Sequence, residues 1–306
     1  MLKKNVPLIF GEVLFDIFEN KNSVPGGAPF NVAWHLRGLG LQPFFVSRVG
    51  SDGNGNRIIQ RMKDWGMSSR GVQKDDRHPT GTVSVTISNG EPEFDIHPEQ
   101  AYDFIDFSRI KNLVENSSYP LLYHGTLAIR NDISRNTLKM IKQKTGAKVF
   151  LDINIREPWW SSELVTLQLA AANWVKCNAD ELKLIAEITG SSDENLYELA
   201  AKICKIFSLD FLIVTLGEQG AFIIDKNEQL NKSQPRPVAN LVDTVGAGDG
   251  FSAVSIFGIL NNWQNQVILE RAVEFAAKIC GIRGATLNDH NYYDLILDRW
   301  KNEDGE

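Results

Sequence analysis

The sequence predicts an α/β fold with three layers, in which helices cover both faces of a mostly parallel central sheet. Short apolar segments typical of buried strands alternate along the chain with helical segments of roughly 10–15 residues. Glycines such as Gly66 and Gly146 follow expected helix ends, where a left-handed residue stops a helix. Strand–helix–strand units make right-handed crossovers, so neighbouring strands are expected to run parallel.

The expected elements follow one another in that alternating order. Strands are predicted at residues 43–49, 147–152, 173–177, 211–215 and 221–225. Helices are predicted at residues 54–65, 134–144, 162–172, 180–188, 194–207, 248–260 and 266–280, and the last two close the chain. Ligands bind such sheets outside the carboxyl ends of the strands, so the polar residues that follow strands are the candidates for a site.

Residues 80–102 have a different pattern. Val83, Val85 and Ile87 alternate with polar residues, which is typical of a half-exposed strand. Asn89-Gly90 predicts a tight turn, after which alternation resumes on the way back. We expect a two-stranded ribbon that stands off the main body.

Composition excludes several classes of protein. The 306 residues carry a net charge of −6, which argues against a general nucleic-acid binder, because such proteins need a basic surface. Cys177, Cys204 and Cys280 show no C-x-x-C spacing, so neither a disulfide framework nor a zinc site is expected. No apolar run reaches the ~18 residues of a membrane span, and a cytoplasmic protein without a membrane partner is expected.

The segment from Asp243 to Asp249, with Gly246, Ala247 and Gly248 before the aspartate, is the most informative. Glycines let the backbone approach an anion, and the first turn of a helix offers free N–H donors there. A carboxylate at such a place repels phosphate. It has a role in chemistry if it accepts a proton from an attacking hydroxyl. The alternative is an ordinary aspartate that caps the helix.

This string resembles the C-terminal signature of the ribokinase-like (PfkB-type) carbohydrate kinases. The resemblance implies that Asp249 is the catalytic base and that the backbone of Gly246, Ala247 and Gly248 forms an anion hole for the γ-phosphate of ATP. It also implies the ribokinase-like three-layer fold and a small β-sheet lid.

Two later blocks are similar to the nucleotide motifs of the same family. Asn178 and Glu181 match its N-x-x-E motif, which implies a Mg²⁺ ion held through water, although Glu181 could also serve the first turn of a helix. The T-x-G-x-x-G nucleotide loop is matched by Thr215, Gly217 and Gly220, a segment that could also be a plain turn between strands. Cys280 is also expected to contribute to the nucleotide site.

The N-terminal blocks resemble the sugar-binding signature of the family, which implies that Asp16, Gly27 and Asn31 bind the sugar. Asp52 follows in the next block and could instead start a helix. Arg156, in a D-x-N-x-R block similar to that of fructokinases, is expected either to neutralise the transferred phosphate or to pair with Asp152 or Glu157.

The resemblance covers nearly the whole chain and implies one kinase domain over residues 1–306, with a lid from about 12–24 and 80–102. It implies transfer of phosphate from ATP to a primary hydroxyl, with fructose as first choice and 2-keto-3-deoxygluconate or ribose as alternatives. A homodimer through the lid is expected. A non-catalytic sugar-binding protein is the rival from another class. The family also has a monovalent cation site, which would lie near Asp243. Residues 286–289 lack the proline-containing tail common in the family, and this departure counts against such a site here.

Overall fold

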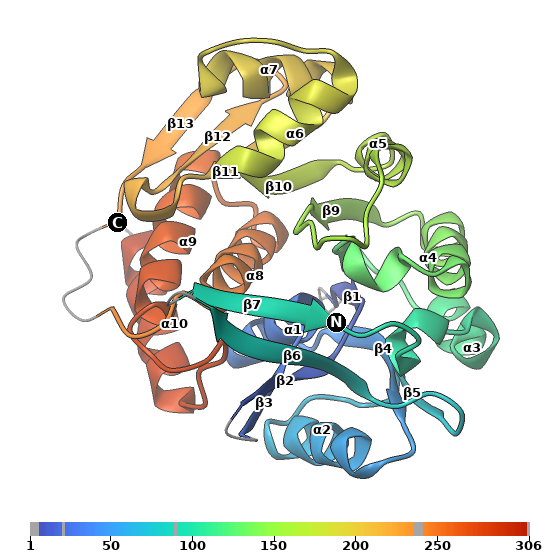
Figure 1. Cartoon of the computed structure of the whole chain (residues 1–306). Coiled ribbons are helices and arrows are strands. Elements are labelled where there is room, and N and C mark those ends of the chain that lie inside the picture. The colour runs from blue at the N-terminus through green and yellow to red at the C-terminus, as the bar shows by residue number, and fades with distance from the viewer. Residues whose placement is uncertain (1–5, 20–21, 89–90, 236–240, 305–306) are drawn as a thin grey trace.

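The computed structural model describes residues 6–19, 22–88, 91–235 and 241–304, and it confirms the three-layer arrangement (Figure 1). A nine-stranded sheet forms the middle layer. Its strands, in spatial order, are β13 (Leu230–Ser233), β12 (Ala221–Asp225), β11 (Phe211–Thr215), β10 (Trp174–Asn178), β9 (Lys148–Asp152), β8 (Leu121–His124), β1 (Leu8–Phe10), β4 (Phe44–Gly50) and β5 (Val72–Asp75). The seven strands from β11 to β5 run parallel, and β12 and β13 add an antiparallel edge.

The chain builds this sheet outward from β1 in two directions. After β1 it adds β4 and then β5 on one side, and it then returns to add β8 to β13 on the other side. The loops that leave β1 and β8 therefore diverge at the carboxyl edge of the sheet, where a crevice for ligands is expected.

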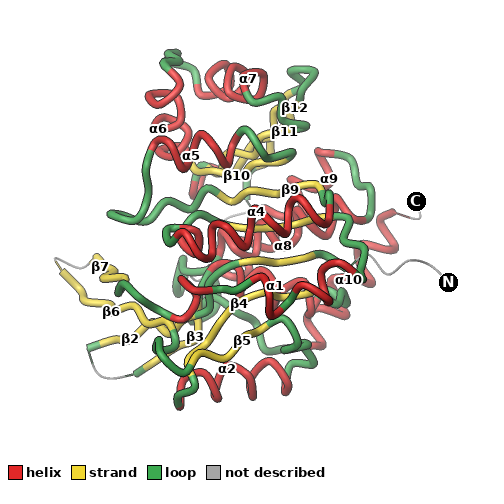
Figure 2. Tube along the Cα trace, turned by 90° about the vertical axis from the view of Figure 1, so that its right-hand side faces the viewer, coloured by secondary structure: helices red, strands yellow, loops and turns green. Residues whose placement is uncertain are grey.

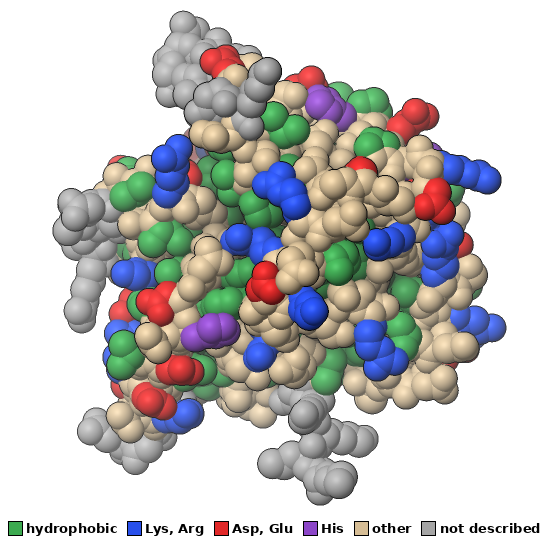
Figure 3. All heavy atoms as spheres, turned by 90° about the horizontal axis from the view of Figure 1, so that it is seen from below, with side chains coloured by type: hydrophobic (Ala, Val, Ile, Leu, Met, Phe, Trp, Pro, Cys, Tyr) green, Lys and Arg blue, Asp and Glu red, His purple; other side chains and the backbone are tan. Residues whose placement is uncertain are grey.

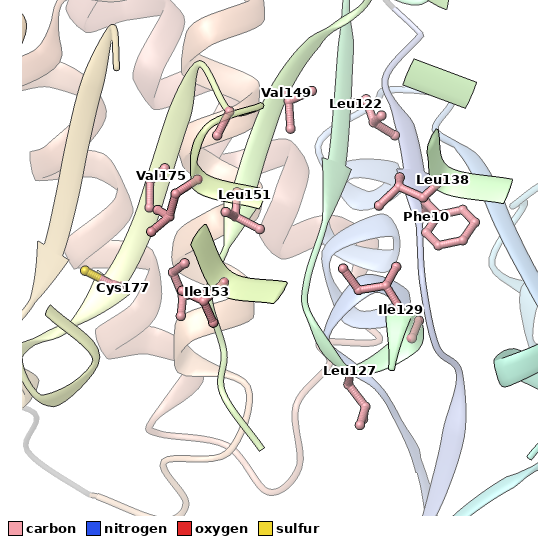
Figure 4. Close-up of a cluster of buried hydrophobic side chains, with 14 of the residues drawn as sticks. Phe10, Leu122, Leu127, Ile129, Leu138, Val149, Leu151, Ile153, Val175 and Cys177 are labelled. Atoms are coloured by element: carbon pink, nitrogen blue, oxygen red, sulfur yellow. The ribbon is translucent and has the colours of Figure 1, made fainter. Parts of the chain in front are cut away.

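Two hydrophobic clusters, one on each face of the sheet, hold the layers together. The central strands are buried on both faces, so successive side chains enter opposite clusters, as Leu8 and Ile9 do. The first cluster is covered by α3 (Lys111–Glu115), α4 (Asp132–Thr145), α5 (Ser162–Leu169), α6 (Ala179–Thr189) and α7 (Leu196–Ile206). In Figure 4, side chains from four adjacent strands lie together in it with Leu138 of α4.

The second cluster is covered by α1 (Ala28–Gly38), α2 (Gly53–Asp64), α8 (Ala247–Leu260), α9 (Asn265–Ile279) and α10 (His290–Asp304). Helix α8 is apolar on all sides and its side chains from Phe251 to Gly258 are buried, as expected for a helix enclosed by other helices. The first turn of α8 is consequently fixed in position.

A second, four-stranded sheet stands off the main body, as Figure 2 shows. Its order is β3 (Ser23–Gly26), β2 (Leu14–Phe18), β6 (Gly81–Ser88) and β7 (Glu91–Ile96). The ribbon of β6 and β7 was predicted, and one lid was expected to hold it together with residues 12–24. The parallel pairing of β2 with β6, with Leu14 opposite Gly81, was not predicted. The turn predicted at Asn89-Gly90 lies outside the described residues.

One prediction about the end of the chain is wrong. The helix predicted at 266–280 does not close the chain, because α10 follows it and buries Tyr293, Ile296 and Trp300 against α8 and α9. The spacing of these three residues places them on one face of a helix, but the surrounding segment is strongly polar.

The surface of the described residues is mixed in charge. On the face drawn in Figure 3, basic and acidic side chains are interspersed with apolar ones rather than gathered into one basic field. Among the described helices, none is both long enough and apolar enough to cross a membrane.

Candidate active site

Helix α8 begins at a turn that only glycine fits. Gly246 has a φ of 81°, in the left-handed region, and a Cβ added there would overlap Ala285. The helix therefore starts at Ala247, and the amides of its first turn have no partners within the helix. The amide of Ala247 donates to the carbonyl of Thr244, before the helix, at 3.3 Å. Such a helix end attracts anions.

Asp249 lies in that first turn but does not cap the helix. The N-cap residue is Gly246, which has no side chain, so the alternative of an ordinary capping aspartate is wrong. The carboxylate of Asp249 instead accepts a hydrogen bond from Nδ2 of Asn31, with 2.8 Å between Nδ2 and Oδ2. Asn31 is buried in the first turn of α1, which starts after Gly27 (φ 102°). Residues 218 positions apart thus meet where two helices begin.

The carboxyl groups of Asp249, Asp16 and Glu12 all have raised pKa values. Burial raises the pKa of Asp249 to about 6, with opposition from the hydrogen bond of Asn31. Burial likewise raises the pKa of Asp16, on β2, to about 6 and that of Glu12 to about 7. The positive charge of Arg156 acts on all three, so Arg156 lies within electrostatic range of both the lid sheet and α8.

A cleft of about 430 Å³ lies beside the start of α8, at the carboxyl ends of β9, β10 and β11. Five residues proposed from the sequence line it, namely Arg156, Asn178, Glu181, Thr215 and Gly248. Arg156 makes no ion pair among the described residues, so its expected pairing with Asp152 or Glu157 is not found. Lys176 pairs with Asp152 instead.

Asn178 and Glu181 hold each other at the mouth of the cleft in a reciprocal capping box. Oδ1 of Asn178 accepts the amide of Glu181 at 2.8 Å, and Oε2 of Glu181 accepts the amide of Asn178 at 2.9 Å. Oε1 of Glu181 also accepts the amide of Ile155. Each carboxylate oxygen keeps a further lone pair, which fits a hydrated Mg²⁺ ion bound through water. The described residues include no group of three or more His, Cys, Asp or Glu arranged around a metal.

The remaining nucleotide candidates serve turns next to the cleft. Gly217 and Gly220 have positive φ values and close the turn between β11 and β12, where a Cβ on Gly220 would overlap Ser233. The carbonyl of Cys280 accepts the amides of Val242 and Asp243, so it anchors the strand-like approach to Gly246. Gly217, Gly220 and Cys280 all lie outside the residues that line the cleft.

The sugar candidates come from the lid and from the start of α1. Asp16 on β2 lies against the backbone of Gly26, and Gly27 packs against the carbonyl of Glu12. Asp52 is the N-cap of α2, as the structural alternative expected: its carboxylate accepts the amide of Gly55 at 2.7 Å and the amide and hydroxyl of Thr80.

Three buried residues of this region were missed as candidates. Lys176, in the middle of β10, forms an ion pair with Asp152, the last residue of β9, and Glu12 has a buried Oε2 with no hydrogen-bond partner among the described residues. A lysine inside the apolar strand Trp174–Asn178 was a visible signal, because charged residues are rarely buried without a partner.

Comparison with known proteins agrees with this geometry. Residues 11–291 match the pfkB family of carbohydrate kinases. Fructokinase-2 of Oryza sativa subsp. japonica is 27% identical over 300 residues, which cover 90% of this chain and 87% of the relative.

Two crystal structures are similar over most of their length. An uncharacterised sugar kinase from Pyrococcus horikoshii in complex with ATP is 26% identical, with a TM-score of 0.76 and coverage of 92% of this chain and 94% of the other. A fructokinase from Vibrio cholerae with fructose, ADP and calcium bound is 25% identical, with a TM-score of 0.79 and coverage of 96% and 99%. The chain thus has the ribokinase-like fold and belongs to the pfkB family of carbohydrate kinases, which are phosphotransferases that act on a sugar hydroxyl.

Proposed function

We propose that this protein transfers the γ-phosphate of ATP to a primary hydroxyl of fructose, with Asp249 as the general base. The observation that carries the proposal is the 2.8 Å hydrogen bond between Asn31 and Asp249. It joins a residue from the sugar-binding signature to the carboxylate at the start of α8, beside a cleft that Gly248 lines. A base at this point stands between the two substrates.

The proposed reaction uses groups that the chain supplies. Asp249 takes the proton of the hydroxyl, whose oxygen attacks the γ-phosphorus in line while the bond to ADP breaks. The amides of Gly246, Ala247 and Gly248 stabilise negative charge on the transferred group, because they are held in place before the reaction. The raised pKa of Asp249 suits it to accept a proton near neutral pH.

The other proposed roles rest on the family signatures and, for Arg156, Thr215, Asn178 and Glu181, also on their place in the cleft. Arg156 lines the cleft and offsets the charge of the transferred phosphate. Thr215 and Gly217 contact the nucleotide, and Asn178 and Glu181 hold Mg²⁺ through water. When bound, Mg²⁺ neutralises charge on the phosphates of ATP. Asp16, Gly27 and Asn31 hold the sugar, and the lid excludes water that would otherwise compete as nucleophile.

Fructose is proposed because the rice relative and the Vibrio cholerae structure are fructokinases at 27% and 25% identity. 2-Keto-3-deoxygluconate and ribose are the competing substrates. A coupled ADP-release assay across these three sugars and glucose should give the highest kcat/KM for fructose. A higher kcat/KM for another sugar would identify that sugar as the substrate and leave the proposed phosphoryl transfer unchanged. Binding of a sugar without ADP release from any of them would favour the non-catalytic alternative.

The role of the base is tested by Asp249→Asn. The variant keeps an acceptor for Asn31 but cannot take a proton, so kcat should fall by about 10²–10⁴-fold. Binding of a non-hydrolysable ATP analogue, measured by calorimetry, should change little. Asp132→Asn is the matched control, because Asp132 is an exposed acid in the first turn of α4, on the other face of the sheet. Normal turnover by Asp249→Asn would refute the mechanism.

We also propose that residues 1–306 form one cytoplasmic kinase unit that dimerises through its lid. Phe18 at the end of β2 and Val24 on β3 support the dimer, because both are large apolar residues that remain 37% and 38% exposed on the lid sheet.

A further inference from the structure

A buried ion pair lies directly beside the proposed site of phosphoryl transfer. Lys176, in the middle of β10, is 7% exposed, and its Nζ lies 3.0 Å from both carboxylate oxygens of Asp152, the last residue of β9. Ser252 of α8 donates to Oδ2 of Asp152 at 2.8 Å, and the hydroxyl of Tyr123 on β8 donates to the same oxygen at 3.3 Å. Side chains from three other elements, β10, α8 and β8, therefore fix this carboxylate.

Lys176 reaches the cleft from this anchored position. It lines the cleft together with Gly248 and Arg156, and a Cβ added to Gly248 would lie 3.5 Å from its Nζ. The ammonium is thus next to the backbone of the first turn of α8. An ammonium has three donors, and Asp152 takes two bonds, so a donor remains for a ligand in the cleft.

The charge of Lys176 is maintained by its surroundings. Burial alone would lower the pKa of Lys176, but the charge and hydrogen bonds of Asp152, with smaller contributions from Glu181 and Asp249, together raise it. The ammonium of Lys176 is thus within electrostatic range of both the proposed base, Asp249, and the proposed Mg²⁺ ligand, Glu181.

We propose that Nζ of Lys176 contacts the phosphoryl group during its transfer, and that Asp152, held by Ser252 and Tyr123, positions that ammonium; this rests on the phosphoryl transfer proposed above. The bond from the γ-phosphorus to the bridging oxygen of ADP breaks, the bond to the sugar oxygen forms, and the hydroxyl proton passes to Asp249. Lys176 neither gains nor loses a proton. It stabilises charge on the equatorial oxygens from the side opposite the solvent, in addition to Arg156.

The competing interpretation is an ion pair that only joins β9 to β10. Buried ion pairs are weak evidence for stability, and neutral partners often replace them without loss of the fold. The double variant Lys176→Met/Asp152→Asn removes both charges together and leaves no unpaired buried ion. Lys148→Met/Asp210→Asn is the matched control, because this exposed pair also involves β9, at the amino end of the strand.

In the double variant, kcat should fall by about 10²–10³-fold. Calorimetry should show at least tenfold weaker binding of AMP-PNP, which has a γ-phosphate, and less than threefold weaker binding of ADP. The control pair should leave all three values within about threefold. A kcat within threefold of the parent, or equal losses for AMP-PNP and ADP, would show that the pair is structural and overturn the proposal.

A single variant keeps the proposal testable if the double variant does not fold. Asp152→Asn keeps the shape of the side chain and a hydrogen-bond acceptor for Lys176, but it removes the charge that positions the ammonium. Both kcat and the affinity for AMP-PNP should therefore fall, while the affinity for ADP should change less than threefold. Unchanged kcat, or equal losses for AMP-PNP and ADP, would contradict the proposal. Asp249→Asn distinguishes failure of the proposed function from failure of this inference. If Asp249→Asn is inactive while the Lys176 variants are fully active, only the assignment of Lys176 fails.

Discussion

The carboxyl groups of Asp249 and Asp16 lose their charge within an accessible pH range. Asp249 and Asp16 both have pKa values raised to about 6 by burial, so each is protonated below that pH and ionised above it. A protonated Asp249 cannot accept the proton of the sugar hydroxyl. Activity should therefore be present above about pH 6 and should fall as the pH decreases through 6.

We expect log(kcat/KM) for the sugar to decrease below about pH 6, with a slope of one if Asp249 alone must be ionised and of two if Asp16 must be as well. The measurement is a coupled assay between pH 5 and 8, with the coupling enzymes in excess at each pH. Asp16→Asn should leave a slope of one and raise KM. A flat profile down to about pH 5 would contradict the assignment of the base.

At the scale of elements, the start of α8 depends on a residue without a side chain. Gly246→Ala should cost about 1–3 kcal/mol from the left-handed backbone alone, and more because the new methyl group overlaps Ala285. It should also reduce kcat at least about tenfold, since it shifts the amides of the proposed anion hole.

The control for Gly246 is Gly40→Ala. Gly40 has nearly the same φ, 83° against 81°, but an added Cβ would meet no atom within 4 Å. Urea unfolding should show a smaller loss of stability for Gly40→Ala than for Gly246→Ala, and kcat should be unchanged. Equal losses of stability would mean that the overlap with Ala285 relaxes freely.

The start of α2 is tied to the lid through Asp52. Asp52→Ala removes the cap of the helix and two hydrogen bonds to Thr80, which precedes β6, so it should lower the free energy of unfolding by about 2–3 kcal/mol. Asn131→Ala removes only a cap, that of α4, and should cost about 1 kcal/mol in the same urea titration. Similar losses in both variants would show that the bonds to Thr80 contribute little.

The elements of the main body were largely predictable, because buried parallel strands are continuous apolar runs and their helices stop at glycines. The strands β5, β8 and β13 were not predicted, although β8 is a short buried apolar run, and neither was the pairing of β2 with β6. The sequence of β13 is Leu-Asn-Lys-Ser, an edge strand with no apolar pattern. The pairing of β2 with β6 joins residues about 67 positions apart.

The site was predictable to a similar degree. The glycine-rich turn, Asn178 and Glu181 are local strings, and they could be found without a fold. The contact of Asn31 with Asp249 and that of Lys176 with Asp152 depend on how α1 meets α8 and how β10 meets β9, which no local pattern specifies.

At the scale of the whole molecule, the exposed apolar residues of the lid predict a homodimer. Light scattering after size exclusion should give twice the mass of one chain. Phe18→Glu with Val24→Glu should shift the protein to a monomer and raise KM for the sugar, because the lid loses its partner. Leu295→Glu, at a 71% exposed position on α10, is the control and should leave the dimer intact. A monomeric parent protein would refute the prediction.

Because the sheet grows outward from β1, the residues proposed to bind the sugar and those proposed to bind the nucleotide lie in separate stretches of the sequence. The proposed sugar ligands come from the stretch before β4, whereas the residues that line the cleft proposed for the nucleotide all come from residue 152 onward. Substitutions in the first stretch can therefore change which acceptor is chosen while the donor is handled as before. This order of strands therefore favours the evolution of relatives that accept different sugars but use the same phosphate donor. Asp249, which contacts Asn31, lies where the two stretches meet.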